Sequence, residues 1–257
     1  MSIKLFWRCE GTSLSGTHDH SDGDTSTSGI NGGALTAEAA RIGSFGILRP
    51  SSQAGGFNFN APGIFPGTVT APTDSVGSIA LSVFYPVAVD TGTSTAAGLR
   101  FRGTASPNDN FGFRPTGTGG YKFSMQSVAG GTINLATQDL ITVGSWFGVV
   151  ARWDFPNNKR RIELYDASGT KIDEAEDYAT NIQAFIPPDI SSGTNGINTG
   201  TAGASFAQNI YYDNLFIANA FDEPLQNNLT ITSYTEYDGS LPEEVVSSVL
   251  MGQVWTQ

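Results

Sequence analysis

The chain has 257 residues, 39% of them hydrophobic and 14% charged, and its 24 acidic residues exceed its 13 basic residues to give a formal net charge of −11. This length can bury a sizeable core, and the acidic balance argues against a nucleic-acid partner, because phosphate binding requires clustered cations. No stretch approaches the roughly 18 apolar residues of a membrane-spanning helix, so we expect no membrane insertion.

The first predicted strand covers residues 3–11, "IKLFWRCEG". It contains the single cysteine, Cys9, which rules out an intrachain disulfide framework. The apolar setting of Cys9 predicts a buried, inert thiol. The N-terminus lacks the apolar h-region and the small-residue cleavage site of a secretory signal, so we expect synthesis in a cytoplasm without a signal peptide.

Residues 17–29, "THDHSDGDTSTSG", read as a polar loop that holds both histidines. His18, His20 and Asp22 match the H-x-H-x-D beginning of a dinuclear metallo-hydrolase signature. Gly23 stands where that signature requires another histidine, and no histidine follows residue 20. A zinc site on the two histidines would need a strand to bring them to one side, and this stretch predicts a loop.

Two interpretations of the acidic residues in this loop remain open. Asp19, Asp22 and Asp24 could supply the oxygen ligands of a calcium ion, with Gly23 permitting a sharp turn. The alternative is a solvated acidic loop and a chain without any cofactor. The spacing does not fit an EF-hand, because aligning Gly23 to the invariant sixth position puts Gly29 where the twelfth-position Glu is needed.

Alternating apolar and polar residues predict further strands through the middle of the chain. They cover residues 45–51, 56–61, 77–88, 98–104, 110–116, 120–128, 131–138, 145–155, 160–167 and 171–179. Turn sequences such as "GTGG" and "FPNNK" separate them and supply the Gly or Asn that hairpins favour. Such a series predicts an all-β sandwich or barrel.

The strand predicted at 171–179 also carries the acids nearest to a glycosidase arrangement. Glu174 and Glu176 alternate and so share one face, but Ala175 stands between them where such motifs have an acid. No nucleophile elbow or phosphate loop occurs elsewhere. We therefore expect a non-enzymatic protein, with a polysaccharide-degrading enzyme as the weaker alternative.

The last third contains three different segments. Residues 187–205 are small and polar and predict a long surface loop. Residues 208–221, "QNIYYDNLFIANAF", predict the closing strand. Residues 223–257 form a C-terminal extension with a short helix, in which Ser240 and Glu243 have capping-box spacing. Its apolar stripe should dock on its own domain or on a neighbouring subunit, with Val245, Val249, Leu250 and Trp255 as the expected oligomer contacts.

The order of these patterns resembles the laminin-G and concanavalin A-like jelly-roll superfamily. The resemblance rests mainly on "DLITVGSWFGVVARWDFPNNKRRIELYDASGTKI" and on the closing "NIYYDNLFIANAF". It implies one antiparallel, two-sheet jelly-roll sandwich over residues 1–222, followed by the extension. In such a fold Trp146 and Trp153 are expected to anchor the core or a sheet edge, while Asp213 and Asn214 serve as hydrogen-bonding groups.

Two functions follow from this organisation as expectations. One is a non-catalytic structural protein of a tailed-phage particle, located in the virion, homo-oligomeric and in contact with other virion proteins. The other is a carbohydrate-binding module or adhesin, and a virion protein could also carry a glycan-reading face. Exposed aromatic rings would contact the sugar, and the candidates are Tyr211, Tyr212, Phe111 and Phe113.

Overall fold

The computed structural model describes residues 3–7, 9, 20–21, 26–30, 33–41, 44–49, 56–60, 76–86, 99–102, 111–116, 119–126, 132–138, 140–154, 156–178, 196–198 and 209–218. Almost all of these residues lie in strands or in the turns that join them. The one helix among them is a single 3-10 turn, Ala37–Ala39. No helix in the described ranges is therefore long and apolar enough to span a membrane.

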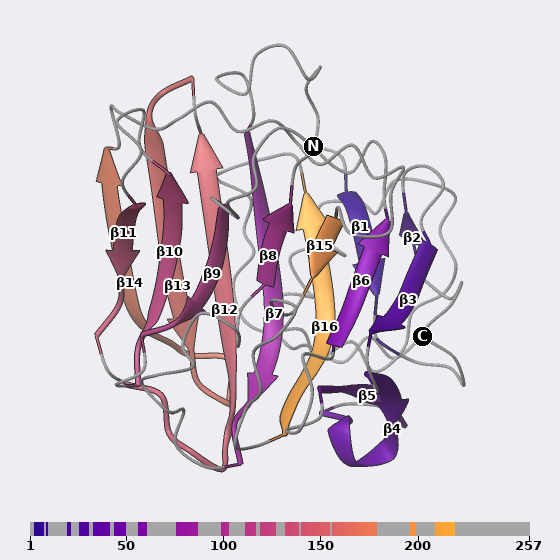
Figure 1. The fold of residues 1–257 in the computed structure, drawn as a ribbon. Coiled ribbons are helices and arrows are strands. Elements are labelled where there is room, and N and C mark those ends of the chain that lie inside the picture. The colour runs from indigo at the N-terminus through magenta and orange to yellow at the C-terminus, as the bar shows by residue number, and fades with distance from the viewer. Residues whose placement is uncertain are drawn as a thin grey trace, which may run out of the picture.

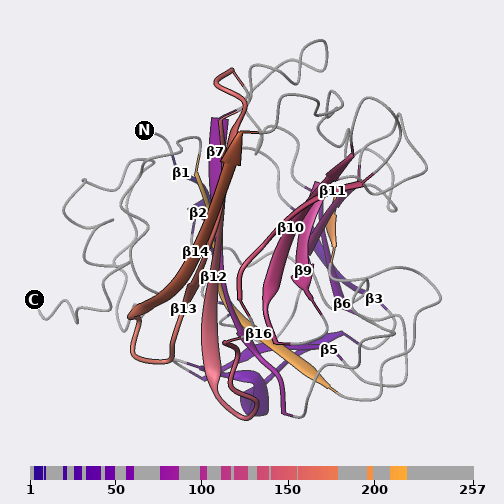
Figure 2. The same ribbon diagram turned by 90° about the vertical axis from the view of Figure 1, so that its left-hand side faces the viewer.

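The described strands form two antiparallel sheets that lie face to face as the two layers of a sandwich (Figures 1 and 2). The larger sheet has the order β14-β13-β12-β7-β16-β1-β2, with β5 also paired to β16 and β4 to β5. Its strands are β1 Ile3–Trp7, β2 His20–Ser21, β4 Ala34–Thr36, β5 Gly46–Arg49, β7 Val76–Phe84, β12 Trp146–Asp154, β13 Lys159–Tyr165, β14 Lys171–Tyr178 and β16 Ile210–Ala218.

The smaller sheet has the order β11-β10-β9-β8-β15-β6-β3. Its strands are β3 Ser26–Ile30, β6 Gly56–Asn60, β8 Leu99–Arg102, β9 Phe111–Pro115, β10 Tyr121–Gln126, β11 Thr132–Ala136 and β15 Gly196–Asn198. The structure confirms the predicted all-β, two-sheet antiparallel sandwich. All twelve strands predicted from alternation are present within a few residues of their expected bounds.

Four short strands, β2, β3, β4 and β15, were not predicted. The polar stretch 17–29 was expected to be a loop, but it contains β2 and most of β3. β15 lies inside the expected loop 187–205, where it bridges β6 and β8. These strands are two to five residues long and lack an apolar alternation, so long-range pairing and not local sequence defines them.

The core lies between the sheets and is rich in aromatic side chains. Tyr85 and Phe147 of the larger sheet stack with ring centroids 5.5 Å apart. Tyr121 of the smaller sheet meets the Phe147 ring edge-on at 6.0 Å. All three are buried, and tilted or stacked contacts of this kind add to the hydrophobic stabilisation of the packed rings.

A buried arginine also joins the two sheets. The side chain of Arg160 on β13 is 0% exposed and binds both carboxylate oxygens of Asp177 on β14, through Nε at 2.6 Å and Nη2 at 2.8 Å. Its Nη1 donates to the backbone oxygen of Phe123 on β10 across the interface at 3.3 Å. Because the guanidinium is paired and hydrogen-bonded, its charge can be held in the interior.

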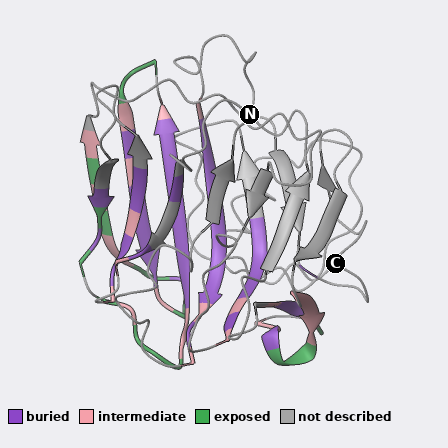
Figure 3. Ribbon diagram, in the orientation of Figure 1, coloured by how far each residue is buried: buried purple, intermediate pink, exposed green. Residues whose placement is uncertain are grey.

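The two central strands of the larger sheet are buried on both faces (Figure 3). Seven consecutive residues in each of β7 and β12 are buried, including polar ones such as Ser78 and Ser82. Cys9, just beyond β1, is also fully buried. The predicted burial of this thiol is confirmed. Trp153 is 1% exposed, so it anchors the core as expected.

Trp153 depends on a glycine in the neighbouring strand. Gly77 of β7 is the cross-strand partner of Trp153. A Cβ atom at position 77 would lie 2.3 Å from Cζ2 of the indole. The absence of a side chain at Gly77 therefore makes room for the ring.

We predict that Gly77→Ala destabilises the fold by about 1–3 kcal/mol, because the added methyl group overfills a packed site. Equilibrium denaturation measures the effect. The same substitution in a Trp153→Phe background should cost less, because the smaller ring leaves space. Equal costs in the two backgrounds would show that the two residues are energetically independent.

Candidate ligand-binding site

Three aromatic side chains lie side by side on neighbouring strands of the larger sheet. Phe84 of β7 is paired in register with Trp146 of β12 on one side and with Tyr211 of β16 on the other. The ring centroids are 5.5 Å apart for Trp146 and Phe84 and 5.6 Å apart for Phe84 and Tyr211. All three residues are partly exposed. We call these three residues the aromatic row.

The strand alternation explains why the aromatic row lies outside the core. The next residues along two of these strands, Phe147 and Tyr212, are buried, at 3% and 0% exposure. Successive side chains in a strand point to opposite faces. The aromatic row therefore lies on the outer face of the larger sheet.

A turn beside the aromatic row adds further apolar surface. Leu140 and Val143 are 42% and 43% exposed. The backbone N–H of Gly144 donates to the oxygen of Tyr85, the residue after Phe84, at 2.8 Å. This bond holds the turn at the end of the sheet where the aromatic row lies. Exposed apolar side chains beside half-exposed rings are typical of a surface that contacts a ligand or partner.

Arg41 lies across the adjacent part of the same face. Its backbone N–H donates to Oδ2 of Asp213 on β16 at 2.8 Å, and its Nη1 donates to the hydroxyl of Ser82 on β7 at 2.8 Å. Its Nη2 reaches the backbone oxygen of Ala167, in the turn after β13, at 2.9 Å. Gly148 of β12, the partner of Ser82, has no side chain to obstruct this path.

The strand that supplies Tyr211 is irregular at the point where Arg41 binds it. The register between β16 and β7 shifts between Asp213 and Phe216, and Asn214 has a left-handed φ of 51°. Oδ1 of Asp213 accepts the N–H of Asn214 at 2.8 Å. Both residues are buried. Asp213 serves as a hydrogen-bonding group, as expected, whereas the side-chain amide nitrogen of Asn214 is buried without a hydrogen-bond partner in the part of the chain that the structure describes. This bulge ends the pairing of β16 with β5, and pairing with β1 begins at Leu215.

Burial lowers the pKa of the Arg41 guanidinium, while Asp213 and Asp166 oppose that effect. An arginine nevertheless remains charged at neutral pH. Ser82 precedes Phe84 by two positions on the same face, a spacing of about 7 Å along a strand. The site thus combines a row of rings with a cation held close by, which suits a ligand that has apolar faces and polar edges.

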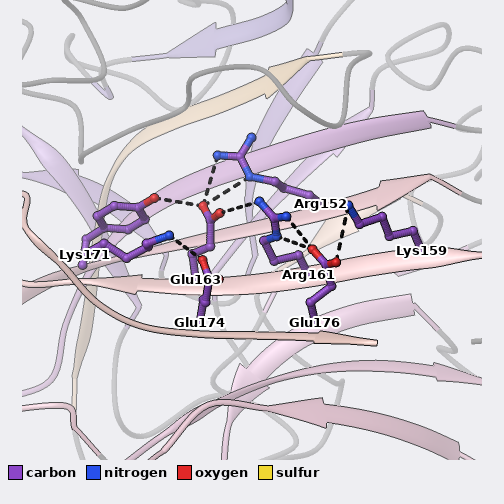
Figure 4. A network of polar contacts seen from close by, with 8 residues as sticks. Arg152, Lys159, Arg161, Glu163, Lys171, Glu174 and Glu176 are labelled. Carbon is purple, nitrogen blue, oxygen red and sulfur yellow. Dashed lines mark hydrogen bonds and ion pairs between the residues drawn. The ribbon is translucent and has the colours of Figure 1, made fainter. Parts of the chain in front are cut away.

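Figure 4 shows a network of ion pairs across β12, β13 and β14. None of its residues belongs to the aromatic row. Its buried part joins Arg152 to Glu163, with Nη2 and Oε2 3.0 Å apart, and the Tyr165 hydroxyl donates to the same oxygen at 2.9 Å. Its exposed part contains Arg161 and Lys159 with Glu176, and Lys171 with Glu174.

This network accounts for the acids that came closest to a catalytic pattern. Glu174 and Glu176 lie on one face of β14, as expected from their spacing, and each forms an ion pair within the sheet. The hydrogen bond from Lys171 lowers the pKa of Glu174, so this carboxylate stays ionised at neutral pH. Burial, followed by the charge of Glu163, raises the pKa of Tyr165. These groups stabilise the sheet.

The predicted sugar-contacting residues have different positions. Tyr211 belongs to the aromatic row, whereas Tyr212 is 0% exposed and presents no ring to a ligand. Phe111 and Phe113 lie in β9, in register with Met125 and Phe123 of β10, and Phe123 is fully buried. The side chains of Phe111 and Phe113 lie outside the part that the structure describes, so their contact with a sugar remains a prediction.

The remaining predicted residues fall outside the described ranges. These are the calcium candidates Asp19, Asp22 and Asp24, and the oligomer contacts Val245, Val249, Leu250 and Trp255. The C-terminal extension, 223–257, and the exact boundary of the domain at 222 lie there too. Within the part of the chain that the structure describes, no three His, Cys, Asp or Glu side chains gather as a metal site.

Sequence reasoning missed most of this site. Trp146 was read as an anchor, Phe84 was part of a predicted strand with no assigned role, and Arg41 carried no signal. The run "SVFYP" did place an aromatic residue at the end of a strand. No local pattern could reveal that Arg41 contacts Asp213, 172 positions away.

No protein-family model matches the chain, and no curated protein matches it in sequence. Solved structures do share its fold. The botulinum neurotoxin serotype D binding domain superposes with a TM-score of 0.61 at 11% identity, over 98% of this chain and 52% of that one. The binding domain of Paraclostridial Mosquitocidal Protein 1 gives 0.56 at 13% identity, over 97% and 52%.

The botulinum neurotoxin serotype G binding domain gives a TM-score of 0.55 at 11% identity, over 88% of this chain and 46% of that one. The chain thus spans about half the length of the structures that it resembles. At these identities the likeness shows the β-sandwich fold.

We predict that Glu163→Gln destabilises the protein by about 3 kcal/mol, because it removes the charge that balances a buried Arg152. Glu174→Gln is the matched control. Glu174 is 46% exposed, and pairs in solvent contribute about 1 kcal/mol or less. Urea denaturation of both variants tests this, and similar small losses in both would contradict a buried ion pair at Glu163.

Proposed function

We propose that this chain is a non-catalytic carbohydrate-binding module that holds its ligand on the aromatic row. The observation that carries the proposal is the set of three half-exposed rings in cross-strand contact, Trp146, Phe84 and Tyr211. A sugar ring has one or two faces made of C–H groups and an edge of hydroxyls. Flat, rigid side chains offer such faces a large contact area at a small entropic cost.

The surroundings of the aromatic row support the same ligand class. Arg41 is bonded to Ser82, two positions from Phe84 on β7, so its guanidinium lies near the rings. The Tyr and Trp side chains carry one polar group each. Polar groups at the border of an apolar floor orient a ligand and give specificity. A purely apolar partner would gain nothing from the guanidinium.

We propose a non-catalytic role because the described carboxylates that came nearest to a catalytic pattern are already engaged in structural contacts. Glu163, Glu174 and Glu176 are engaged in ion pairs, and Asp213 accepts two backbone N–H groups. The structural neighbours are binding domains of toxins, and one is described as the receptor binding domain of botulinum neurotoxin D. A binding role agrees with both points.

The setting of the module is a further part of the proposal. Display on a phage particle, as a decoration, head-fibre or tail component, would place many copies of the site side by side, and weak sugar contacts then gain avidity. This location and the homo-oligomer remain predictions from composition and from the C-terminal extension. Calcium in the loop of Asp19, Asp22 and Asp24 likewise remains a prediction.

We expect the protein to bind a subset of glycans on an array, and Trp146→Ala or Tyr211→Ala to weaken that binding about tenfold or more, the loss typical of a central aromatic contact. Titration calorimetry with the selected glycan measures it. Tyr211→Phe is the matched control, because it keeps the ring and should retain most of the affinity.

The unfolding midpoint of each variant shows whether a loss of binding reflects a loss of fold. If no glycan is bound, or if folded Trp146→Ala and Tyr211→Ala variants bind as well as the parent, the aromatic row is not a carbohydrate site.

A further inference from the structure

Arg41 lies over a second row of residues that runs parallel to the aromatic row. Two positions further along each strand, pairing brings together Gly148 of β12, Ser82 of β7 and Asp213 of β16. The backbone N–H of Arg41 bonds Asp213, and its guanidinium bonds the Ser82 hydroxyl and the backbone oxygen of Ala167, in the turn after β13. The side chain therefore crosses this second row, which lies about 7 Å from the aromatic row.

The guanidinium of Arg41 has more hydrogen-bond donors than partners. An arginine side chain carries five N–H donors, and the structure pairs two of them, one on Nη1 and one on Nη2. Within the part of the chain that the structure describes, the other three have no acceptor. Because Arg41 is partly exposed, these donors can bind acceptors of a ligand that lies on the aromatic row.

The two existing bonds also hold the guanidinium in one place. Ser82 is fully buried, and its cross-strand partner Gly148 has no side chain that could displace the guanidinium. A donor that is already ordered loses less conformational entropy on binding than a free side chain does. Arg41 is thus suited to fix the orientation of a ligand.

Two acidic groups lie close to this guanidinium. Burial lowers the pKa of Arg41, and the negative charges of Asp213 and Asp166 act in the opposite direction. Asp213 is fully buried, and Asp166 lies in the turn after β13. One positive charge thus lies near two negative charges, so the guanidinium offers hydrogen bonds without a surplus of positive charge.

The other described cations on this face of the larger sheet are balanced in the same way. Each forms an ion pair with a glutamate: Arg152 with Glu163, Lys159 and Arg161 with Glu176, and Lys171 with Glu174. The whole chain has a net charge of −11, which repels anions at longer range. An acidic glycan would therefore meet no excess of positive charge on the described part of this face.

A neutral glycan fits these observations better than an acidic one. Its C–H faces can lie on the rings of the aromatic row, and its hydroxyl and ring oxygens can accept the N–H groups of Arg41. A carboxylate or sulfate on the same sugar could also reach Arg41, but it would approach Asp213 and Asp166 at the same time. Like charges placed in this way weaken binding.

We propose that the glycan on the aromatic row is uncharged and that Arg41 determines its orientation by donating hydrogen bonds to its hydroxyl or ring oxygens. This inference rests on the proposed function, because it concerns the same site. It adds the charge class of the ligand and a specificity-determining residue outside the three rings.

The first test places neutral and acidic oligosaccharides in matched pairs on an array. The pairs are cello-oligosaccharides with cellouronates, methyl-esterified with free oligogalacturonates, and galactan oligosaccharides with their sulfated forms. We expect the full chain to bind the neutral member of at least one pair about tenfold or more tightly than the acidic member. Its affinity should change less than about twofold between about 0.05 and 0.5 M salt, because no ion pair forms.

The second test removes the donors. Arg41→Leu should lower the affinity for the selected neutral glycan about tenfold or more, the loss typical of hydrogen bonds from a charged group. Lys171→Leu is the matched control, since it removes the same charge from an exposed position in the ion-pair network and should leave the affinity unchanged.

Monodeoxy analogues of the selected glycan separate a direct contact from a structural effect of Arg41→Leu. Removing the hydroxyl that Arg41 contacts should weaken binding to the parent protein and change binding to Arg41→Leu little. A residue that only supports the fold would show the same loss with both proteins.

A measurement on the unmodified chain tests the inference if Arg41→Leu does not fold. The Nε–H resonances of arginine are followed by NMR while the selected glycan is added. The Arg41 signal should shift with saturation. The signal of Arg160, whose side chain is 0% exposed and paired with Asp177, should stay in place.

The outcomes distinguish this inference from the proposed function. Equal or tighter binding of the acidic member in every pair, full affinity in folded Arg41→Leu, or an Arg41 signal that does not move at saturation would overturn the inference. If Trp146→Ala still weakens binding in those cases, the aromatic row remains the carbohydrate site. If no glycan is bound at all, the proposed function and this inference are both wrong.

Discussion

The register of the two antiparallel sheets is the constraint on which the rest of this structure depends. A slip of one residue would exchange the faces of a strand. In β12, for example, it would turn the buried Phe147 outward and bring the partly exposed Trp146 into the core. The aromatic row depends on the same constraint, because Trp146, Phe84 and Tyr211 meet only while β12, β7 and β16 keep their pairing. The aromatic row is thus a consequence of backbone hydrogen bonding.

Buried polar groups hold that register in the larger sheet. Arg160 and Asp177 tie β13 to β14 and reach across to β10, while Arg152 and Glu163 bind β12 to β13. At the other side, Arg41 connects β16, β7 and the turn after β13. Breaking a buried pair costs more than forming it gains, because the remaining charge has lost its solvation. The network therefore penalises alternative pairings and so favours one arrangement of strands.

The fold was largely predictable from the sequence, and the candidate site was not. Alternation predicted twelve of the strands, whereas β2, β3, β4 and β15 are defined by their pairing with other segments. The same limit explains why Tyr212, which is buried, was expected to contact a sugar. Alternation showed that neighbours such as Tyr211 and Tyr212 must face opposite ways, but not which of them faces the core. Arg41 could not be assigned at all, since its partners lie 41, 126 and 172 positions away.

We propose above all that the aromatic row is the surface that binds sugar. The most direct measurement follows the tryptophan indole N–H resonances of the labelled protein by NMR while the selected glycan is added. Trp146 lies in the aromatic row, and Trp153, at 1% exposure, is the internal control in the core. The account predicts that the Trp146 signal shifts with saturation and that the Trp153 signal stays in place. A bound glycan that leaves the Trp146 signal unmoved would contradict it.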